Sequence, residues 1–322
     1  MWLISNSSLS LPESRGLGNV SASAYLRLYA TSAIVWFHAG ATAPLRGAIG
    51  GSGLVVFAYL SFLHAGRRYG HRAAVMRLTQ RLLIPWAAWW LIYAAVDFRL
   101  ARGVPRELTA PTSVAEMLAW PAIHLWYLPF VFVSSLGLLG MSRIIAPMHG
   151  RTKVALALVA GLGLLLAMIA LPEALPFPLG QFVPALPTIG LGLVYGYCLR
   201  IGDRRRRLGY FAAIAALVTV ACIPIWLWGS NTDSHTIAIA YTGGSLLMIL
   251  CTLSLPRHRL SIHLSALSMG IYLAHPLAWL TLRKFIVGFT DLPYWIIALA
   301  TLVLAALMTW VIRQIRYLRA IV

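Results

Sequence analysis

His38 is the side chain that points most clearly to chemistry, because it lies inside an apolar segment, eleven residues after Arg27. Ionisable groups are costly in hydrocarbon, so one within a membrane segment indicates function. Eleven residues of helix span about 16 Å, roughly half of a bilayer core of about 30 Å. We therefore expect Arg27 near one interface and His38 past the midplane, where a neutral imidazole can act as a general base. The alternative is a histidine that bonds a neighbouring helix for packing.

Two arginines open a later apolar segment, in the run Arg77-Leu-Thr-Gln-Arg81-Leu-Leu-Ile-Pro85-Trp86. At i,i+4 they share one helix face, and guanidinium groups bind phosphate well. We expect Arg77 and Arg81 to hold an anionic phosphate on the cytoplasmic side. The alternative is that they only determine topology.

Two further blocks combine histidine with aromatic residues. They read His124-Leu-Trp126-Tyr127-Leu-Pro129-Phe130 and Ser268-Met-Gly270-Ile-Tyr272-Leu-Ala-His275-Pro276. The expected direction of each segment puts His124 and His275 at a depth similar to that of His38. Three histidines are therefore predicted to converge in the outer half of the membrane.

The aromatic members of these blocks are predicted to line a substrate site near the outer face. Trp126 and Tyr127 suit stacking against a sugar, but they equally suit an interfacial aromatic belt. Tyr272 suits either the same site or simple packing. His275 is expected to line the site, and Pro276 after it also predicts a kink, because proline removes a helix hydrogen bond.

Transmembrane helices are the elements that must position these groups. Of the 322 residues, 60% are hydrophobic and 11% are charged, whereas soluble proteins average about 25% charged. This composition excludes a fully soluble globule and predicts an all-α, polytopic bundle of about ten transmembrane helices. The expected spans are approximately 24–45, 48–65, 80–98, 124–142, 153–171, 184–200, 209–228, 236–254, 263–282 and 293–312.

The charge distribution orients the bundle. The formal net charge is +18, and 20 of the 26 basic residues lie in alternate loops and at the two ends. This is the positive-inside pattern, so both termini are predicted to be cytoplasmic, with residues 1–20 as a tail and 21–322 as the transmembrane domain. Nucleic-acid binding is disfavoured, because no separate domain presents a basic face. Neither the cysteine spacing nor any cluster predicts a metal site, and no cleavable signal peptide is expected.

A base at mid-depth, cations on the cytoplasmic side and an aromatic outer mouth together suggest group transfer across the membrane. With these blocks in this order, the chain resembles the acyltransferase 3 family of integral-membrane O-acyltransferases over about residues 20–315. Arg27 and His38 resemble its first-helix pair. The segment after Arg81 resembles its basic third helix, and the two histidine blocks resemble two more of its motifs.

The resemblance implies transfer of an acyl group, usually acetyl, from cytoplasmic acyl-CoA to a sugar hydroxyl of an exopolysaccharide or other surface glycan. It implies His38 as the essential catalytic residue, Arg27 as its support, and Arg77 with Arg81 as the binding site for acetyl-CoA. The expected location is a bacterial inner membrane, among membrane lipids, with a glycan or lipid-linked sugar as acceptor. No metal is expected.

The chain departs from the family pattern at three places. Ala24 stands where many members carry Asp, and Ser61-Phe62 stands where many carry Ser-Gly-Phe. The third-helix arginines of the family often sit three apart, whereas Arg77 and Arg81 are four apart and Gln80 occupies the position three residues after Arg77. Two rival functions remain open at this point. One is a transporter or flippase for a glycan or metabolite, although no inverted repeat is evident. The other is a non-catalytic subunit of a polysaccharide export complex.

Overall fold

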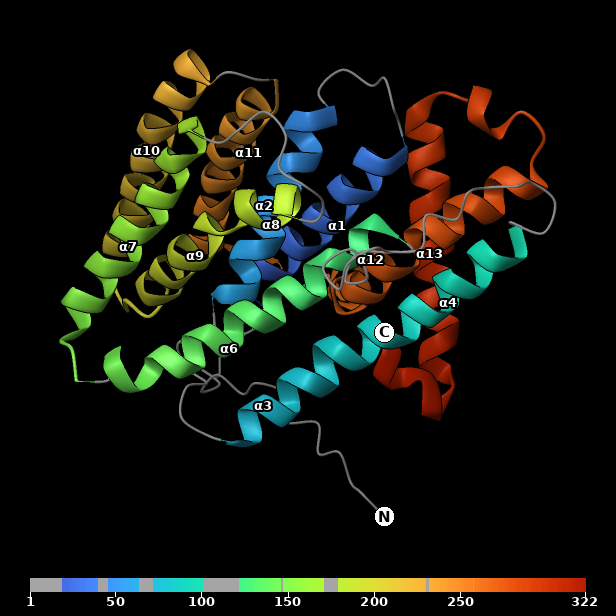
Figure 1. Ribbon diagram of the computed structural model, residues 1–322, viewed down its shortest axis with the longest axis horizontal. Coiled ribbons are helices and arrows are strands. Elements are labelled where there is room, and N and C mark those ends of the chain that lie inside the picture. Colours follow the sequence, from blue (N-terminus) through green and yellow to red (C-terminus); the bar gives the residue numbers. More distant parts are fainter. Residues whose placement is uncertain are drawn as a thin grey trace.

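The fold is a bundle of helices with one small sheet (Figure 1). The computed structural model describes residues 19–39, 46–63, 72–100, 122–145, 147–170, 179–229, 232–256 and 258–322. Within these ranges, five helical stretches are long and apolar enough to cross a membrane: His124–Met141, Gly150–Ile169, Arg204–Trp228, Ser234–Thr252 and Tyr294–Gln314. The protein is therefore built as a multi-pass membrane protein.

Each apolar segment predicted from the sequence contains a long helix. In chain order these are α1 (Ser23–Ala39), α2 (Arg46–Phe62), α4 (Ile84–Leu100), α6 (Tyr127–Ile145), α7 (Gly150–Leu166), α9 (Pro187–Cys198), α10 (Arg204–Trp228), α11 (Thr232–Met248), α12 (Arg259–Phe285) and α13 (Tyr294–Gln314). The predicted helical class is confirmed. Ten membrane crossings and two cytoplasmic termini stay predictions, and most of the predicted N-terminal tail lies outside the described residues.

Short elements join and extend these helices. They are α3 (Arg72–Leu78), the π-helical turn η2 (Thr79–Leu83), η3 (Ile123–Trp126), η4 (Ala167–Ala170), α8 (Leu179–Ala185), η5 (Ile249–Thr252), η6 (Phe289–Asp291) and η7 (Arg316–Ile321). Strands β1 (Asn19–Ser21) and β2 (Ser254–Pro256) pair antiparallel. The sequence did not predict this sheet. It holds the beginnings of α1 and α12 together. Because His38 and His275 also meet further along these two helices, the helices run in the same direction.

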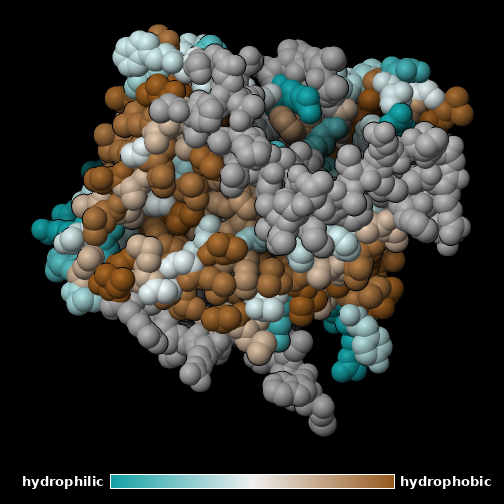
Figure 2. Space-filling view, in the orientation of Figure 1, coloured by the Kyte–Doolittle hydropathy of each residue, from teal (hydrophilic) through white to brown (hydrophobic). Residues whose placement is uncertain are grey.

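Helices α1 and α2 occupy the middle of the molecule. On one side, α2 packs against α9 and α11, which contact α7 and α10; on the other side, α1 packs against α12 and α13. Helices α4 and α6 cross this arrangement obliquely (Figure 1). Many apolar side chains remain outside the core, including Val159, Val220 and Val303 at 69%, 62% and 60% exposure. Hydrophobic residues cover much of the face shown in Figure 2. Such side chains suit contact with lipid tails.

Glycines allow the central helices to approach closely. A Cβ on Gly53 would meet the side chain of Ala33, and a Cβ on Gly196 would meet the backbone carbonyl of Leu63. Small residues at such crossings are the usual means by which membrane helices pack, because the hydrophobic effect does not drive them together in lipid.

The Gly196→Ala substitution should destabilise the bundle. The new methyl group would overlap backbone atoms of Leu63 that no rotamer change can move, and overpacking of this kind costs about 1–3 kcal/mol. Gly163→Ala in α7 is the matched control, because its Cβ meets nothing within 4 Å and alanine favours helix by about 0.5–1 kcal/mol. Thermal unfolding in detergent measures both. Equal midpoints for the two variants would contradict the packing described.

Candidate functional site

Three histidines meet where α1, η3 and α12 come together. The ring centroids of His38 and His275 lie 5.0 Å apart, and those of His124 and His275 lie 5.2 Å apart. His124 and His275 are buried, at 4% and 1% exposure, whereas His38 is exposed. The three rings meet, as the sequence predicted, and their depth in the membrane stays a prediction. Their chemical roles stay predictions.

The orientation of His275 follows from the proline after it. Pro276 has no N–H, so the carbonyl of Tyr272 one turn earlier loses its normal helical donor. The Nδ1–H of His275 donates to that carbonyl at 2.7 Å. Because a carbonyl only accepts, Nδ1 carries the proton, and the Nε2 of a neutral ring keeps its lone pair. The His-Pro pair in α12 therefore sets the tautomer of a buried base.

A tyrosine from α4 inserts at the same place in α12. The hydroxyl of Tyr93 donates to the carbonyl of Leu273 at 2.6 Å and accepts from the backbone N–H of Leu277 at 3.3 Å. Its ring also contacts the ring of His124, with centroids 5.3 Å apart. Tyr93 thus joins α4 to the turn of α12 that contains Pro276 and to the histidine cluster. Sequence reasoning missed it, because a tyrosine in an apolar segment carries no signal of its partner.

Tyr272 packs between the histidine cluster and Phe57 of α2. The Tyr272 hydroxyl donates to the backbone carbonyl of His124, and its ring stacks on Phe57 of α2, with centroids 5.4 Å apart. Tyr272 is 2% exposed. Its observed contacts therefore fix η3 against α12 and α2.

The two aromatic residues after His124 are buried as well. Tyr127 is fully buried, and a hydrogen bond of 2.7 Å joins its hydroxyl to that of Ser61. Trp126 is 6% exposed and packs against Phe130, with ring centroids 5.7 Å apart. Neither ring offers an open face to a ligand in this conformation. Their predicted part in sugar binding stays a prediction.

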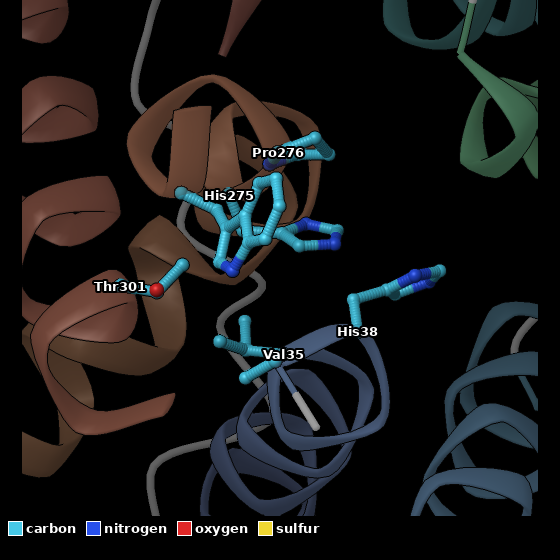
Figure 3. A pocket seen from close by; sticks show the side chains of 7 residues that line it. Val35, His38, His275, Pro276 and Thr301 are labelled. Carbon is cyan, nitrogen blue, oxygen red and sulfur yellow. The ribbon is translucent and has the colours of Figure 1, made fainter. Parts of the chain in front are cut away.

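A cavity of about 150 Å³ opens beside His38 and His275. It is lined from α1 by Val35, His38 and Ala39, from α12 by His275, Pro276 and Trp279, and from α13 by Thr301. Figure 3 shows these side chains arranged around it. Sequence reasoning did not select Trp279 or Thr301. The spacing of Trp279, four residues after His275, could have indicated a shared helix face.

The predicted cations lie away from this cavity. Arg27 is exposed and precedes His38 by eleven residues of α1, which is about 16 Å on the same helix face. Arg77 lies in the last turn of the short helix α3, Arg81 lies in the π-helical turn η2, and both are exposed. The arrangement leaves an aromatic and histidine-rich centre with a separate basic surface.

Arg46 is closer to His38 along the chain than Arg27, Arg77 or Arg81 is. Its Nε–H donates to the carbonyl of Phe37 at 2.6 Å, and its guanidinium lies 4.3 Å from the centroid of that ring. The ring of Phe37 contacts His38, with centroids 5.2 Å apart. Nothing in the sequence indicated a role for Arg46, yet it binds the end of α1 that carries His38.

A comparison with protein families explains why these groups occur together. A family model described as an acyltransferase domain matches residues 21–313, nearly the whole chain. The chain belongs to the acyltransferase 3 family. It is thus a membrane acyltransferase by family, and the predicted resemblance is confirmed. Comparisons with curated proteins and with solved structures gave no match.

Proposed function

We propose that this acyltransferase moves an acetyl group from cytoplasmic acetyl-CoA to a sugar hydroxyl of an exopolysaccharide or another surface glycan, in a bacterial inner membrane. The observation that carries the proposal is the meeting of His38 and His275 at one cavity, with ring centroids 5.0 Å apart. Acyl transfer to an alcohol needs a base to activate the hydroxyl. An acyltransferase with a cavity lined by two imidazoles meets that need.

His38 is the proposed base. Its imidazole takes the proton of the acceptor hydroxyl while the hydroxyl oxygen attacks the carbonyl carbon of the thioester, and the carbonyl electron pair moves to the oxygen. The tetrahedral intermediate then collapses: the carbonyl reforms, the C–S bond breaks, and the thiolate takes the proton from His38. The Nε2 lone pair of His275 accepts a hydrogen bond from a second hydroxyl of the sugar, which orients the acceptor.

The donor is proposed to enter along α4. Arg77 and Arg81 bind the phosphates of CoA, since guanidinium groups make strong charge-assisted hydrogen bonds with them. From Arg81 to Tyr93 the chain advances twelve residues, or about 18 Å of helix, and Tyr93 contacts His124. Helix α4 therefore links the basic surface to the histidine cluster. The π-helical turn at Thr79–Leu83 is of a kind that often marks functional sites.

Binding of acetyl-CoA tests the donor half of the proposal. A ligand that binds only the folded protein raises its stability by about 2.7 kcal/mol at a hundredfold excess over Kd. We expect acetyl-CoA to raise the unfolding temperature of the detergent-purified protein, and the Arg77→Ala/Arg81→Ala variant to lose this increase. Arg204→Ala/Arg205→Ala is the matched control, because it removes two equally exposed arginines from the start of α10.

Two results would count against this assignment. An increase that survives in the Arg77→Ala/Arg81→Ala variant would place the donor elsewhere. If millimolar acetyl-CoA does not raise the unfolding temperature of a wild-type protein that unfolds cooperatively, acetyl-CoA is not the donor. That result would favour a transporter instead.

A further inference from the structure

Three residues that line the cavity each carry a buried polar atom with no hydrogen-bond partner among the described residues. These atoms are the Nε1 of Trp279, the Oγ1 of Thr301 and the Nε2 of His275. Thr301 itself is only 1% exposed. A buried polar atom left unpaired costs about 1–3 kcal/mol, so three around one cavity indicate that a polar ligand completes them.

Their hydrogen-bonding capacities differ in a useful way. The indole N–H of Trp279 can only donate, and the hydroxyl of Thr301 can donate as well. The Nε2 of His275 accepts, because its Nδ1–H is already bound to the carbonyl of Tyr272. The cavity thus offers two donors from α12 and α13, together with two imidazoles from α1 and α12.

With His38 as the proposed base, the reacting carbonyl is placed beside its imidazole, at this same cavity. A hydroxyl that is bonded to the imidazole of His38 attacks a carbon about 3–3.5 Å away, so the carbonyl oxygen cannot be far from His38. A volume of about 150 Å³ corresponds to roughly five waters at about 30 Å³ each. That is room for an acetyl thioester end and the reacting edge of one sugar rather than for a whole glycan.

We infer that the Nε1–H of Trp279 and the Oγ1–H of Thr301 form the oxyanion hole of this enzyme. This inference rests on the proposed function. As the acceptor oxygen bonds to the carbonyl carbon, the π pair of the carbonyl moves to its oxygen, and both donors hydrogen-bond that negative oxygen. When this electron pair re-forms the carbonyl, the C–S bond breaks, and the two donors then hydrogen-bond the oxygen of the product carbonyl. Fixed donors in a water-poor cavity stabilise such charge strongly.

Two conservative variants test the inference. Trp279→Phe removes the N–H and keeps a ring, and Thr301→Val removes the hydroxyl and keeps the shape. Each should lower kcat by about 10²–10³-fold and leave both KM values unchanged. The assay uses acetyl-CoA as donor and methyl glycosides of common hexoses as acceptors, and it measures the release of free thiol. Thr301→Ser restores a hydroxyl and should recover most of the rate.

Matched controls come from the same two helices. Trp310→Phe changes an exposed residue of α13, and Thr281→Val changes a residue of α12 whose hydroxyl already bonds the carbonyl of Leu277. Both should keep the wild-type rate. Thermal unfolding should show Trp279→Phe and Thr301→Val at least as stable as wild type, because each removes an unpaired buried polar atom.

The outcomes separate the possible roles. A raised KM for the glycoside with unchanged kcat would overturn the inference and assign the two residues to acceptor binding. Wild-type kinetics in both variants would overturn it and leave them as packing residues. If the wild type releases no thiol, the proposed function itself fails and the inference falls with it, whereas a wild type that turns over leaves only the inference at stake.

Discussion

His38→Ala should lower the rate of acetyl transfer by about 10²–10⁴-fold, the range that a positioned general base contributes. His38 is the exposed member of the histidine cluster and borders the cavity, so the acceptor hydroxyl can reach it. Its ring contacts are with Phe37 and His275. Because it is not a core side chain, its truncation should leave the fold intact.

The measurement is thiol release from acetyl-CoA by purified protein, alongside its thermal unfolding. His263→Ala is the control, since His263 is an exposed histidine of α12 away from the cavity. A rate in His38→Ala close to that of wild type, with normal unfolding, would sink the assignment of the base. It would be the result expected of an assembly subunit.

The second large effect is expected at His275. His275→Asn keeps an amide donor near the position of Nδ1, which can still bond the carbonyl of Tyr272, but it leaves nothing at the position of Nε2. If Nε2 orients the acceptor, kcat should fall on the order of 10²-fold, because a small misplacement of a reactant lowers the rate by about that factor. His275→Gln reaches the Nε2 position with an amide oxygen that can accept, so it should retain more activity.

Comparing the two variants separates orientation from packing. Equal losses in Asn and Gln variants, together with lower unfolding temperatures, would show that His275 acts through packing alone. The His38→Ala/His275→Asn double variant adds a further check. Residues in contact are coupled, and their rings are 5.0 Å apart, so the double loss in rate should be smaller than the product of the single losses.

The helices and the membrane class follow from local properties of the chain. Long apolar runs and the placement of arginines are readable in sequence, because each segment must satisfy its backbone hydrogen bonds within itself in lipid. Helix boundaries still differ from the predicted ones. The third segment, for example, was expected to begin at residue 80, and it is continuous with α3 and η2 from Arg72. The π-helical turn has no sequence signature that could have revealed it.

Some residues of the candidate site could be predicted from the sequence, and others could not. His38 and His275 were predictable, because an ionisable group in an apolar segment is rare and costly. The positions of Trp126 and Tyr127 were not, because aromatic residues at a helix start suit an outer mouth as well as the interior that they occupy. Tyr93, Trp279 and Thr301 gave no comparable signal.

The sequence alone determined that this chain is a helical membrane protein of the acyltransferase 3 family, with histidines as its candidate chemistry. Only the tertiary structure decided which side chains meet. The ring contact of His38 with His275 and the hydrogen bonds of Tyr93 to α12 beside Pro276 join segments far apart in the chain. Such contacts depend on how glycine-lined helices cross and on where Pro276 frees a carbonyl. Neither is a property of any one segment.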